Sequence, residues 1–204
     1  MFYDAIRNDH GLRHDPFKAL LAPRPIGWIS TVDIDGRPNL APYSFFGAVA
    51  EQPHIVMVSS AGWKDTLSNI RATGEFVCNL ATWDLREAVN RSSAPLERGR
   101  SEFELVGLTP VPGVLVDAPR VGEAAAALEC RVLQIIQLDN LDGSPSENIC
   151  AFGQVVGIHI ADHAIVDGKF DTANVKPIAR LGYRDYSVVD AAALFQMTRP
   201  PGGE

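Results

Sequence analysis

The chain has 204 residues, 46% of them apolar, and a formal net charge of −7, because 25 acidic residues outnumber 18 lysines and arginines. This length and apolar content suffice for a hydrophobic core, and we expect a single domain over residues 1–204. The acidic balance argues against a nucleic-acid partner, which needs basic surface to neutralise phosphates, and no apolar run approaches the about 18 residues of a membrane helix.

The first 50 residues predict a short helix followed by a β-hairpin. Residues 11–21 can form the helix, which Pro23 and Pro25 end because the residue before a proline avoids helical angles. Residues 26–32 and 39–49 predict two strands, and the Asp-Gly pair between them is typical of a tight turn. Pro42 removes a backbone donor, so the second strand should lie at a sheet edge or carry a bulge.

Residues 54–60 predict a third strand, which runs into a helix over 64–73 that stops at Gly74. Residues 75–81 predict a further strand, and a helix is expected to start at 82–84. Residues 92–121 are rich in proline, glycine and charge, so we expect loops with one or two short elements there, serving as a lid or an interface arm.

The remaining chain predicts long strands. Residues 124–138 and 148–160 are expected to pair across a turn at 139–146, with bends or bulges at Gly153 and Gly157. Residues 165–170 and 183–186 complete the chain's predicted elements. Because helices do not alternate with strands in this half, the pattern favours a mainly β closed barrel with a few flanking helices over a parallel α/β sheet.

The cysteines and the first residues indicate a reducing compartment. Cys78, Cys130 and Cys150 are odd in number, widely spaced and set in apolar segments, so we expect buried thiols rather than a disulfide framework or a metal site. The first 15 residues carry acids and no apolar signal region. We therefore expect a cytoplasmic protein.

Two polar segments could form a binding site. Ser59, Ser60, Lys64, Asp65 and Thr66 surround a predicted helix start, where unpaired N–H groups and a partial positive charge favour a phosphate. The alternative is a helix simply capped by Asp65 or Thr66. Residues 39–44 could present backbone groups to the rim of a heteroaromatic ring, or could be an edge strand protected against aggregation.

No acid–base machinery is visible in the sequence. His54 and His159 lie in strand-like segments, where structural roles are expected, and His163 is not placed to share a metal with His159. No arrangement of serine, histidine and aspartate supports hydrolase chemistry. No catalytic side chain is therefore assigned.

Several segments in order resemble the flavin reductase-like family with the FMN-binding split barrel. They are ARPIGWIST, NLAPYSFFGAV, PHIVMVSS, KDTLSNI and GEFVCNL, followed by GQVVGIHI, VDGKFD and KPIARLGYRDY. The resemblance spans residues 16–186 and leaves 92–121 poorly explained. It implies a split β-barrel fold.

The resemblance also implies a homodimer that binds FMN at the subunit interface. Ser30 and Thr31 would lie near the flavin or its ribityl chain. Asn39, Ala41, Pro42, Tyr43 and Ser44 would line the isoalloxazine ring, and Ser59, Ser60, Lys64, Asp65 and Thr66 would hold the ribityl and phosphate groups. Arg24 and Arg180 are further candidates for phosphate or rim contacts.

By the same resemblance, we expect a flavin reductase that transfers hydride from NADH or NADPH to FMN and passes electrons to an unidentified acceptor, in some relatives a monooxygenase component. The flavin would supply the chemistry and the protein its orientation. A non-catalytic FMN-binding module for flavin storage or electron transfer is the alternative. An interaction protein whose barrel has lost its ligand is the third hypothesis.

Overall fold

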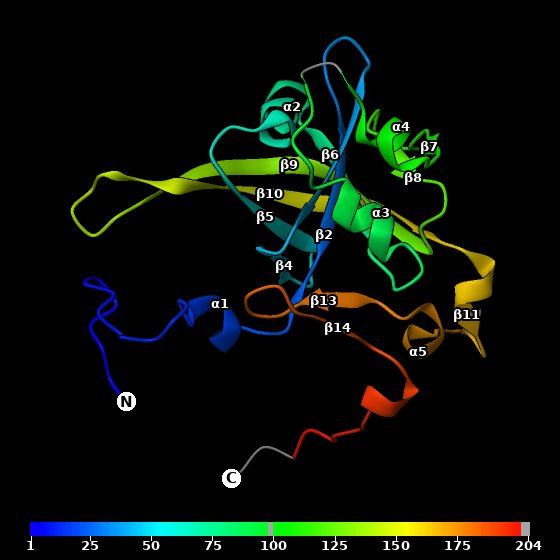
Figure 1. Cartoon of the computed structure of the whole chain (residues 1–204). Coiled ribbons are helices and arrows are strands. Elements are labelled where there is room, and N and C mark those ends of the chain that lie inside the picture. Colours follow the sequence, from blue (N-terminus) through cyan, green and yellow to red (C-terminus); the bar gives the residue numbers. More distant parts are fainter. Residues whose placement is uncertain (98–99, 201–204) are drawn as a thin grey trace.

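The computed structural model describes residues 1–97 and 100–200. Its main sheet contains β2 (Gly27–Val32), β3 (Pro38–Tyr43), β4 (Phe46–Ala50), β5 (Ile55–Ala61), β6 (Glu75–Leu80), β9 (Ala126–Asp139) and β10 (Pro145–Ile160). The strands are antiparallel in the order β3-β2-β6-β9-β10-β5-β4. The sheet curls into a half-barrel (Figure 1), which confirms the mainly β split-barrel prediction. The closed barrel that the strand pattern alone favoured was wrong, because β3 and β4 are the two edges of this sheet and do not pair with each other.

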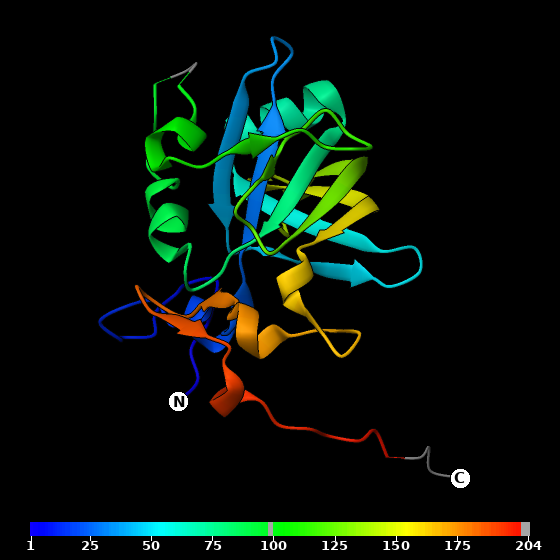
Figure 2. The same ribbon diagram turned by 90° about the vertical axis from the view of Figure 1, so that its right-hand side faces the viewer.

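Smaller elements surround this sheet. The short strands are β1 (Arg24–Pro25), β7 (Pro110–Val111), β8 (Arg120–Val121), β11 (Ile165–Val166), β12 (Lys169–Phe170), β13 (Ile178–Arg180) and β14 (Tyr186–Val188). The helices are α1 (Phe17–Leu20), α2 (Asp65–Thr73), α3 (Arg86–Arg91), α4 (Glu102–Val106) and α5 (Thr172–Val175), with 3₁₀ turns η1 (Asp162–Ala164) and η2 (Ala191–Ala193). The three-stranded sheet β1-β13-β14 lies below the half-barrel in Figure 1, and the chain after η2 runs away from the body (Figure 2).

The turn between β2 and β3 sets the register of the first hairpin. The Asp33 carboxylate accepts hydrogen bonds of 2.9 Å from the amides of Asp35 and Arg37, and Gly36 adopts a φ of 81°. Trp28 then pairs with Pro42. Because β3 is the outermost strand on that side, the missing Pro42 donor is harmless, and the predicted edge position is confirmed.

The prediction of a single strand over residues 39–49 was wrong. The chain bends at Ser44 and Phe45, so that β3 pairs with β2 whereas β4 pairs with β5 at the opposite edge of the sheet. One continuous run of strand-forming residues therefore supplies both edges. The curl brings the Phe46 side chain against Gly27, where a Cβ atom would lie 2.5 Å from the ring, so this approach requires glycine.

Two helix predictions also need correction. The first helix covers only Phe17–Leu20 because the chain before it is irregular, with a φ of 67° at Gly11. The helix expected to start at 82–84 begins at Arg86, since Thr82 forms a β-bridge with Pro177 and the chain turns before the helix. Gly74 ends α2 in the left-handed conformation, as predicted.

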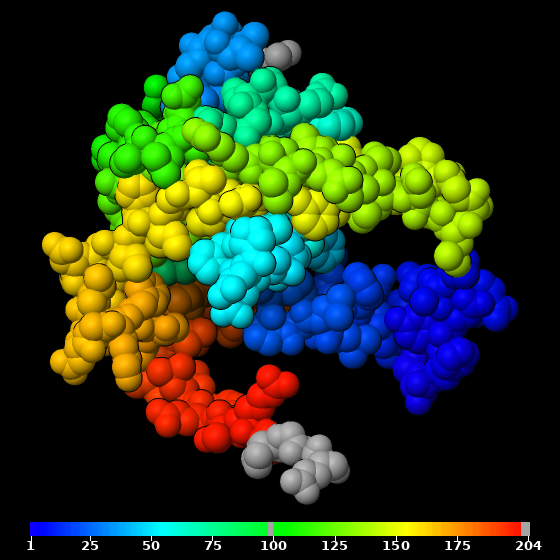
Figure 3. Space-filling model, turned by 180° about the vertical axis from the view of Figure 1, so that it is seen from behind, coloured from blue at the N-terminus to red at the C-terminus, as the bar shows by residue number. Residues whose placement is uncertain are grey.

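Long strands β9 and β10 form a hairpin that projects beyond the body toward the N-terminal segment (Figure 3). Shifts in register occur between Phe152 and Gly153 and between Val155 and Gly157, which confirms the bulges expected at the glycines.

The three cysteines are buried free thiols. None of the helices in the described part of the chain has the length and apolar character needed to span a bilayer.

The segment after α3 is tied to the sheet by buried polar contacts. The indole N–H of Trp28 donates to the Ser92 hydroxyl at 2.9 Å. Buried Glu129 accepts from the amides of Val114 and Leu115 at 2.7 and 2.6 Å, and pairs with His159. Burial acts to raise the pKa of Glu129, but these hydrogen bonds outweigh it and lower the pKa. His159 thus has the structural role expected of it.

Candidate functional site

A cavity of about 600 Å³ lies where the start of α2 faces edge strand β3. Its third wall comes from the segment that follows α3. The lining residues are Asn39, Ala41, Pro42, Tyr43, Lys64, Asp65, Thr66, Ser92, Ser93, Ala94, Pro95, Leu96 and Glu102. The structure therefore brings together both polar segments singled out in the sequence, which lie on different elements.

The start of α2 offers positive charge and amide groups to this cavity. Lys64 is the N-cap residue, with an extended backbone at φ −86° and ψ 173°, rather than Asp65 or Thr66. Among the described residues, no side chain forms a capping hydrogen bond at this end. The amides of the first turn therefore remain available, and they add a partial positive charge beside the Lys64 ammonium group.

Buried side-chain amides connect β3 to α2. Asn39 Nδ2 donates to Thr66 Oγ1 at 2.9 Å and lies 3.4 Å from Thr31 Oγ1. Asn69 Nδ2, one turn further along α2, donates to the same Thr31 hydroxyl at 3.0 Å. Because Thr31 is fully buried, it supports the cavity wall from behind and does not line the cavity.

Tyr43 contributes a phenol to the cavity wall. Burial raises its pKa above the ordinary value, while hydrogen bonding with the Thr66 and Ser60 hydroxyls acts in the opposite direction. The charges of Glu102 and Asp65 raise the pKa further. The phenol therefore stays protonated at neutral pH and keeps an O–H group to donate.

Glu102 is a wall residue that the sequence did not reveal. Only 8% of its surface is exposed, and its carboxylate accepts a hydrogen bond from the Leu40 amide at 2.9 Å. Burial raises its pKa; the bond from Leu40 opposes this effect and the Asp65 charge reinforces it.

The other missed wall residues are 92–96, from the segment expected to form loops, a lid or an arm. Their only sequence signal was the break in pattern after the helix that contains Val89. The contact between Trp28 and Ser92 holds the segment beside β3, and such a long-range contact leaves no periodic trace in the sequence.

A smaller cavity of about 180 Å³ adjoins the first, with Pro42, Tyr43 and Ser93 common to both. It brings in Ser44 and Arg180, two further predicted site residues. The Arg180 guanidinium lies 4.6 Å from the centre of the Tyr186 ring and donates to the Tyr186 hydroxyl.

The remaining predicted site residues do not line either cavity. Ser30 is fully buried, donates to the Pro119 carbonyl and accepts from Asn79. Ser59 accepts from Asn148 at 3.0 Å, and Ser60 donates to the Gly62 carbonyl at 3.2 Å. Arg24 is buried, and its guanidinium donates to the carbonyls of Lys18 and Leu181. These groups support the surrounding backbone.

The cavity can therefore hold an elongated ligand with an anionic group at the α2 end and a flat polar ring along β3. Within the described residues, no group of histidine, cysteine and acidic side chains is placed to hold a metal ion.

Comparison with known proteins identifies the family. The sequence model of the protein family described as flavin reductase like domain matches residues 20–186. An uncharacterized protein of Halalkalibacterium halodurans is 34% identical over 183 residues, which cover 87% of this chain and 86% of that protein.

Solved structures agree with this match. Nitrilotriacetate monooxygenase component B from Bacillus cereus is 31% identical, with a TM-score of 0.84 and coverage of 97% of this chain and 98% of that chain. The 2-nitrobenzoate 2-nitroreductase from Pseudomonas fluorescens is 25% identical, with a TM-score of 0.83 and coverage of 98% and 96%. The chain therefore belongs to the flavin reductase-like family and is a flavin-related oxidoreductase.

Proposed function

We propose that this protein is an FMN-dependent flavin reductase that takes hydride from NADH or NADPH. The carrying observation is that one cavity joins the Lys64 end of α2 to the outer edge of β3. Its volume of about 600 Å³ falls in the range of roughly 300–1,000 Å³ typical of cofactor sites. FMN, with a flat ring and a phosphate tail, matches this distribution of groups.

The residues of the α2 end suit the tail of FMN. The Lys64 ammonium and the first-turn amides provide charge-assisted donors for a phosphate. The Asp65 carboxylate can accept hydrogen bonds from ribityl hydroxyls, and its neighbour Thr66 is held in place by Asn39.

The residues of β3 suit the ring. Ala41, Pro42, Tyr43 and Ser44 follow one another along an edge strand, whose outer backbone groups are not used by a neighbouring strand in the sheet. They can orient the ring, and the Tyr43 O–H can donate to it. Bound FMN supplies the redox chemistry, which explains why the site needs no acid–base pair.

We also infer a homodimer, with FMN at its interface as membership of the flavin reductase-like family implies. A cavity of about 310 Å³ on the sheet is almost entirely apolar in its lining, and Ile158 in its wall is 54% exposed. A second copy of the chain would cover this surface.

A monooxygenase component as the electron acceptor is supported by the name of the Bacillus cereus relative. Buried free thiols agree with a cytoplasmic location.

The test is the visible absorption spectrum of FMN-loaded protein mixed anaerobically with NADH or NADPH in a stopped-flow instrument. The proposal predicts bleaching of the flavin band by at least one of the two. FMN binding without bleaching by either would favour a storage or electron-transfer module. A protein that neither binds FMN nor is stabilised by it would contradict both functions.

A further inference from the structure

A third cavity adjoins the 180 Å³ cavity. It measures about 390 Å³ and is lined by Trp83, Arg86, Arg184 and Tyr186 over a floor that includes Val89 and Ile178. We call it the arginine pocket. It shares Val89, Asn90 and Tyr186 with the 180 Å³ cavity, which in turn shares Pro42, Tyr43 and Ser93 with the large cavity. The three cavities are thus neighbours with shared wall residues, and we refer to them together as the trough.

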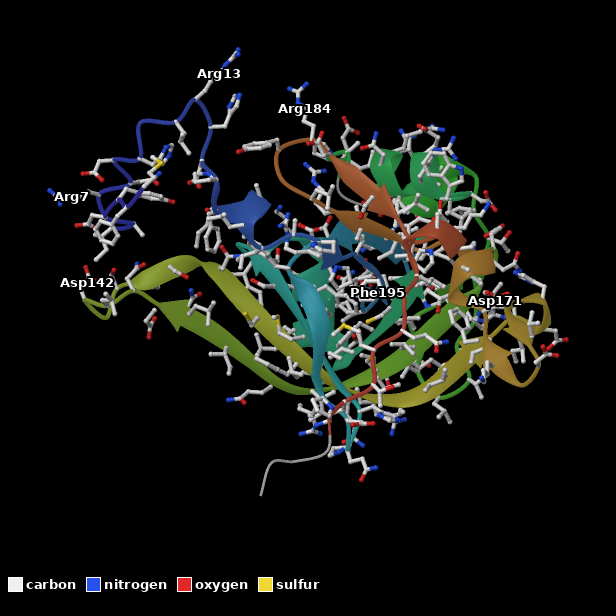
Figure 4. The ribbon with its side chains drawn as sticks, turned by 90° about the horizontal axis from the view of Figure 1, so that it is seen from below. Arg7, Arg13, Asp142, Asp171, Arg184 and Phe195 are labelled. Atoms are coloured by element: carbon white, nitrogen blue, oxygen red, sulfur yellow. The ribbon has the colours of Figure 1, made fainter. Side chains whose placement is uncertain are left out.

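The arginine pocket concentrates positive charge in a chain whose net charge is −7. Arg86 lines it from α3, and Arg184 projects outward from the turn between β13 and β14 (Figure 4). Arg180 stands at the boundary, stacked on Tyr186. Two acids face these cations: Glu87, which also lines the pocket, is 78% exposed and lies 3.8 Å from the Arg86 Nε atom, and Asp185 is the exposed neighbour of Arg184. The cations outnumber these acids.

The pocket also presents aromatic surface. The Arg86 guanidinium lies 4.0 Å from the centre of the Trp83 ring and donates to the Trp83 carbonyl at 2.8 Å. Trp83 and Tyr186 are nearly half exposed, with 45% and 44% of their surface accessible. A preorganised guanidinium group such as that of Arg86 favours bidentate contact with phosphate, and exposed aromatic rings favour stacking with a purine.

We propose that the arginine pocket binds the adenosine diphosphate half of the nicotinamide dinucleotide. This inference rests on the proposed function, in which the donor must reach the flavin ring. Lys64 lines the large cavity but not the arginine pocket, and Ser44 and Tyr43 line the cavity that shares residues with both. A dinucleotide anchored at Arg86 and Arg184 therefore extends its nicotinamide toward β3 without competing for the phosphate end of the FMN site.

The test measures adenosine diphosphate binding by calorimetry, with and without FMN, in wild type and in the Arg86→Ala and Arg184→Ala variants. Each variant should weaken binding by about tenfold, since a charge-assisted hydrogen bond contributes about 1.5–3 kcal/mol and 1.4 kcal/mol is tenfold. In steady-state reduction, each should raise KM for the dinucleotide and leave kcat and FMN affinity within about twofold.

Arg71→Ala is the matched control. Arg71 stacks on Trp63 at 4.1 Å, and Trp63 is 47% exposed, so this pair resembles the pair of Arg86 and Trp83 in geometry and exposure but lies outside the trough. Its loss should leave adenosine diphosphate binding unchanged.

Two outcomes overturn the inference. One is unchanged adenosine diphosphate affinity in both pocket variants; the other is wild-type protein that does not bind adenosine diphosphate. Either result can occur while FMN still binds and is bleached, which leaves the proposed function intact. Failure of FMN binding would overturn the proposed function separately, because nucleotide binding is read without flavin.

Discussion

The side-chain amide of Asn39, on edge strand β3, donates a 2.9 Å hydrogen bond to the hydroxyl of Thr66, in the first turn of α2. Both residues are buried, and both line the large cavity. This bond fixes the distance between the strand proposed to orient the ring and the helix start proposed to hold the phosphate. A ligand that spans both needs that distance to be fixed.

Asn39→Ala should therefore weaken the binding of FMN and of riboflavin by similar factors, because it removes the hydrogen bond that connects the two cavity walls. It should also lower the free energy of unfolding by about 1–3 kcal/mol, the cost of leaving buried polar groups without a partner. Asn140→Ala is the control, since that amide bonds to Ser144 in an exposed turn. Fluorescence titration and urea unfolding check both effects, and a loss confined to FMN would contradict the role of Asn39.

Lys64→Ala should weaken FMN binding by about tenfold or more and leave the affinity for riboflavin within about twofold of wild type. Only FMN carries the phosphate, and a charge-assisted contact contributes about 1.5–3 kcal/mol. Titration of both flavins with wild type, Lys64→Ala and Arg71→Ala gives the comparison, since Arg71 is a cation on the same helix outside the cavity. Equal losses for the two flavins would show that Lys64 does not contact the phosphate.

Glu102→Gln should stabilise the protein more at pH 7 than at pH 4. Folding raises the pKa of Glu102, chiefly through burial. The unfolded chain therefore ionises at lower pH than the folded one, and the stability associated with the neutral carboxyl is lost as the pH rises through the raised value. Glutamine keeps an acceptor for the Leu40 amide but cannot ionise.

Urea unfolding of wild type, Glu102→Gln and Glu104→Gln at both pH values checks this effect, because Glu104 is exposed on the same helix. A difference between Glu102→Gln and wild type that does not change with pH would refute the buried titration.

Gly27→Ala should lower the free energy of unfolding by about 1–3 kcal/mol, the usual cost of overpacking. The new methyl group would lie 2.5 Å from the Phe46 ring, where the curled sheet brings β2 against β4. Gly47→Ala is the matched control, since a Cβ there meets nothing within 4 Å. Thermal unfolding of both variants tests this prediction. Equal stability of Gly27→Ala and Gly47→Ala would mean that the approach of Phe46 to Gly27 is not tight.

Local chemistry made much of the fold predictable. The Asp33–Gly36 turn, the Pro42 edge strand and the Gly74 helix stop each follow from backbone preferences of single residues, and the structure has all three. The break at Ser44 and Phe45 was missed because strand-forming residues continue through it. Which edge each half joins depends on the curl of the whole sheet, which no local pattern encodes.

The candidate site divides in the same way. Asn39, Lys64 and Thr66 lie on elements with clear signals, so the sequence could single them out. Glu102 and residues 92–96 come from a segment without periodicity, whose position depends on distant partners such as Trp28 and Glu129. Ser30 and Arg24 were expected near the ligand, but in the structure their polar groups bond to the protein itself.

A crystal structure of the protein grown with FMN would show directly where the cofactor binds. We expect the FMN phosphate within hydrogen-bonding distance of the Lys64 ammonium and the first-turn amides of α2, with the isoalloxazine ring along residues 39–44. FMN bound elsewhere, or bound with its phosphate away from α2, would contradict this expectation.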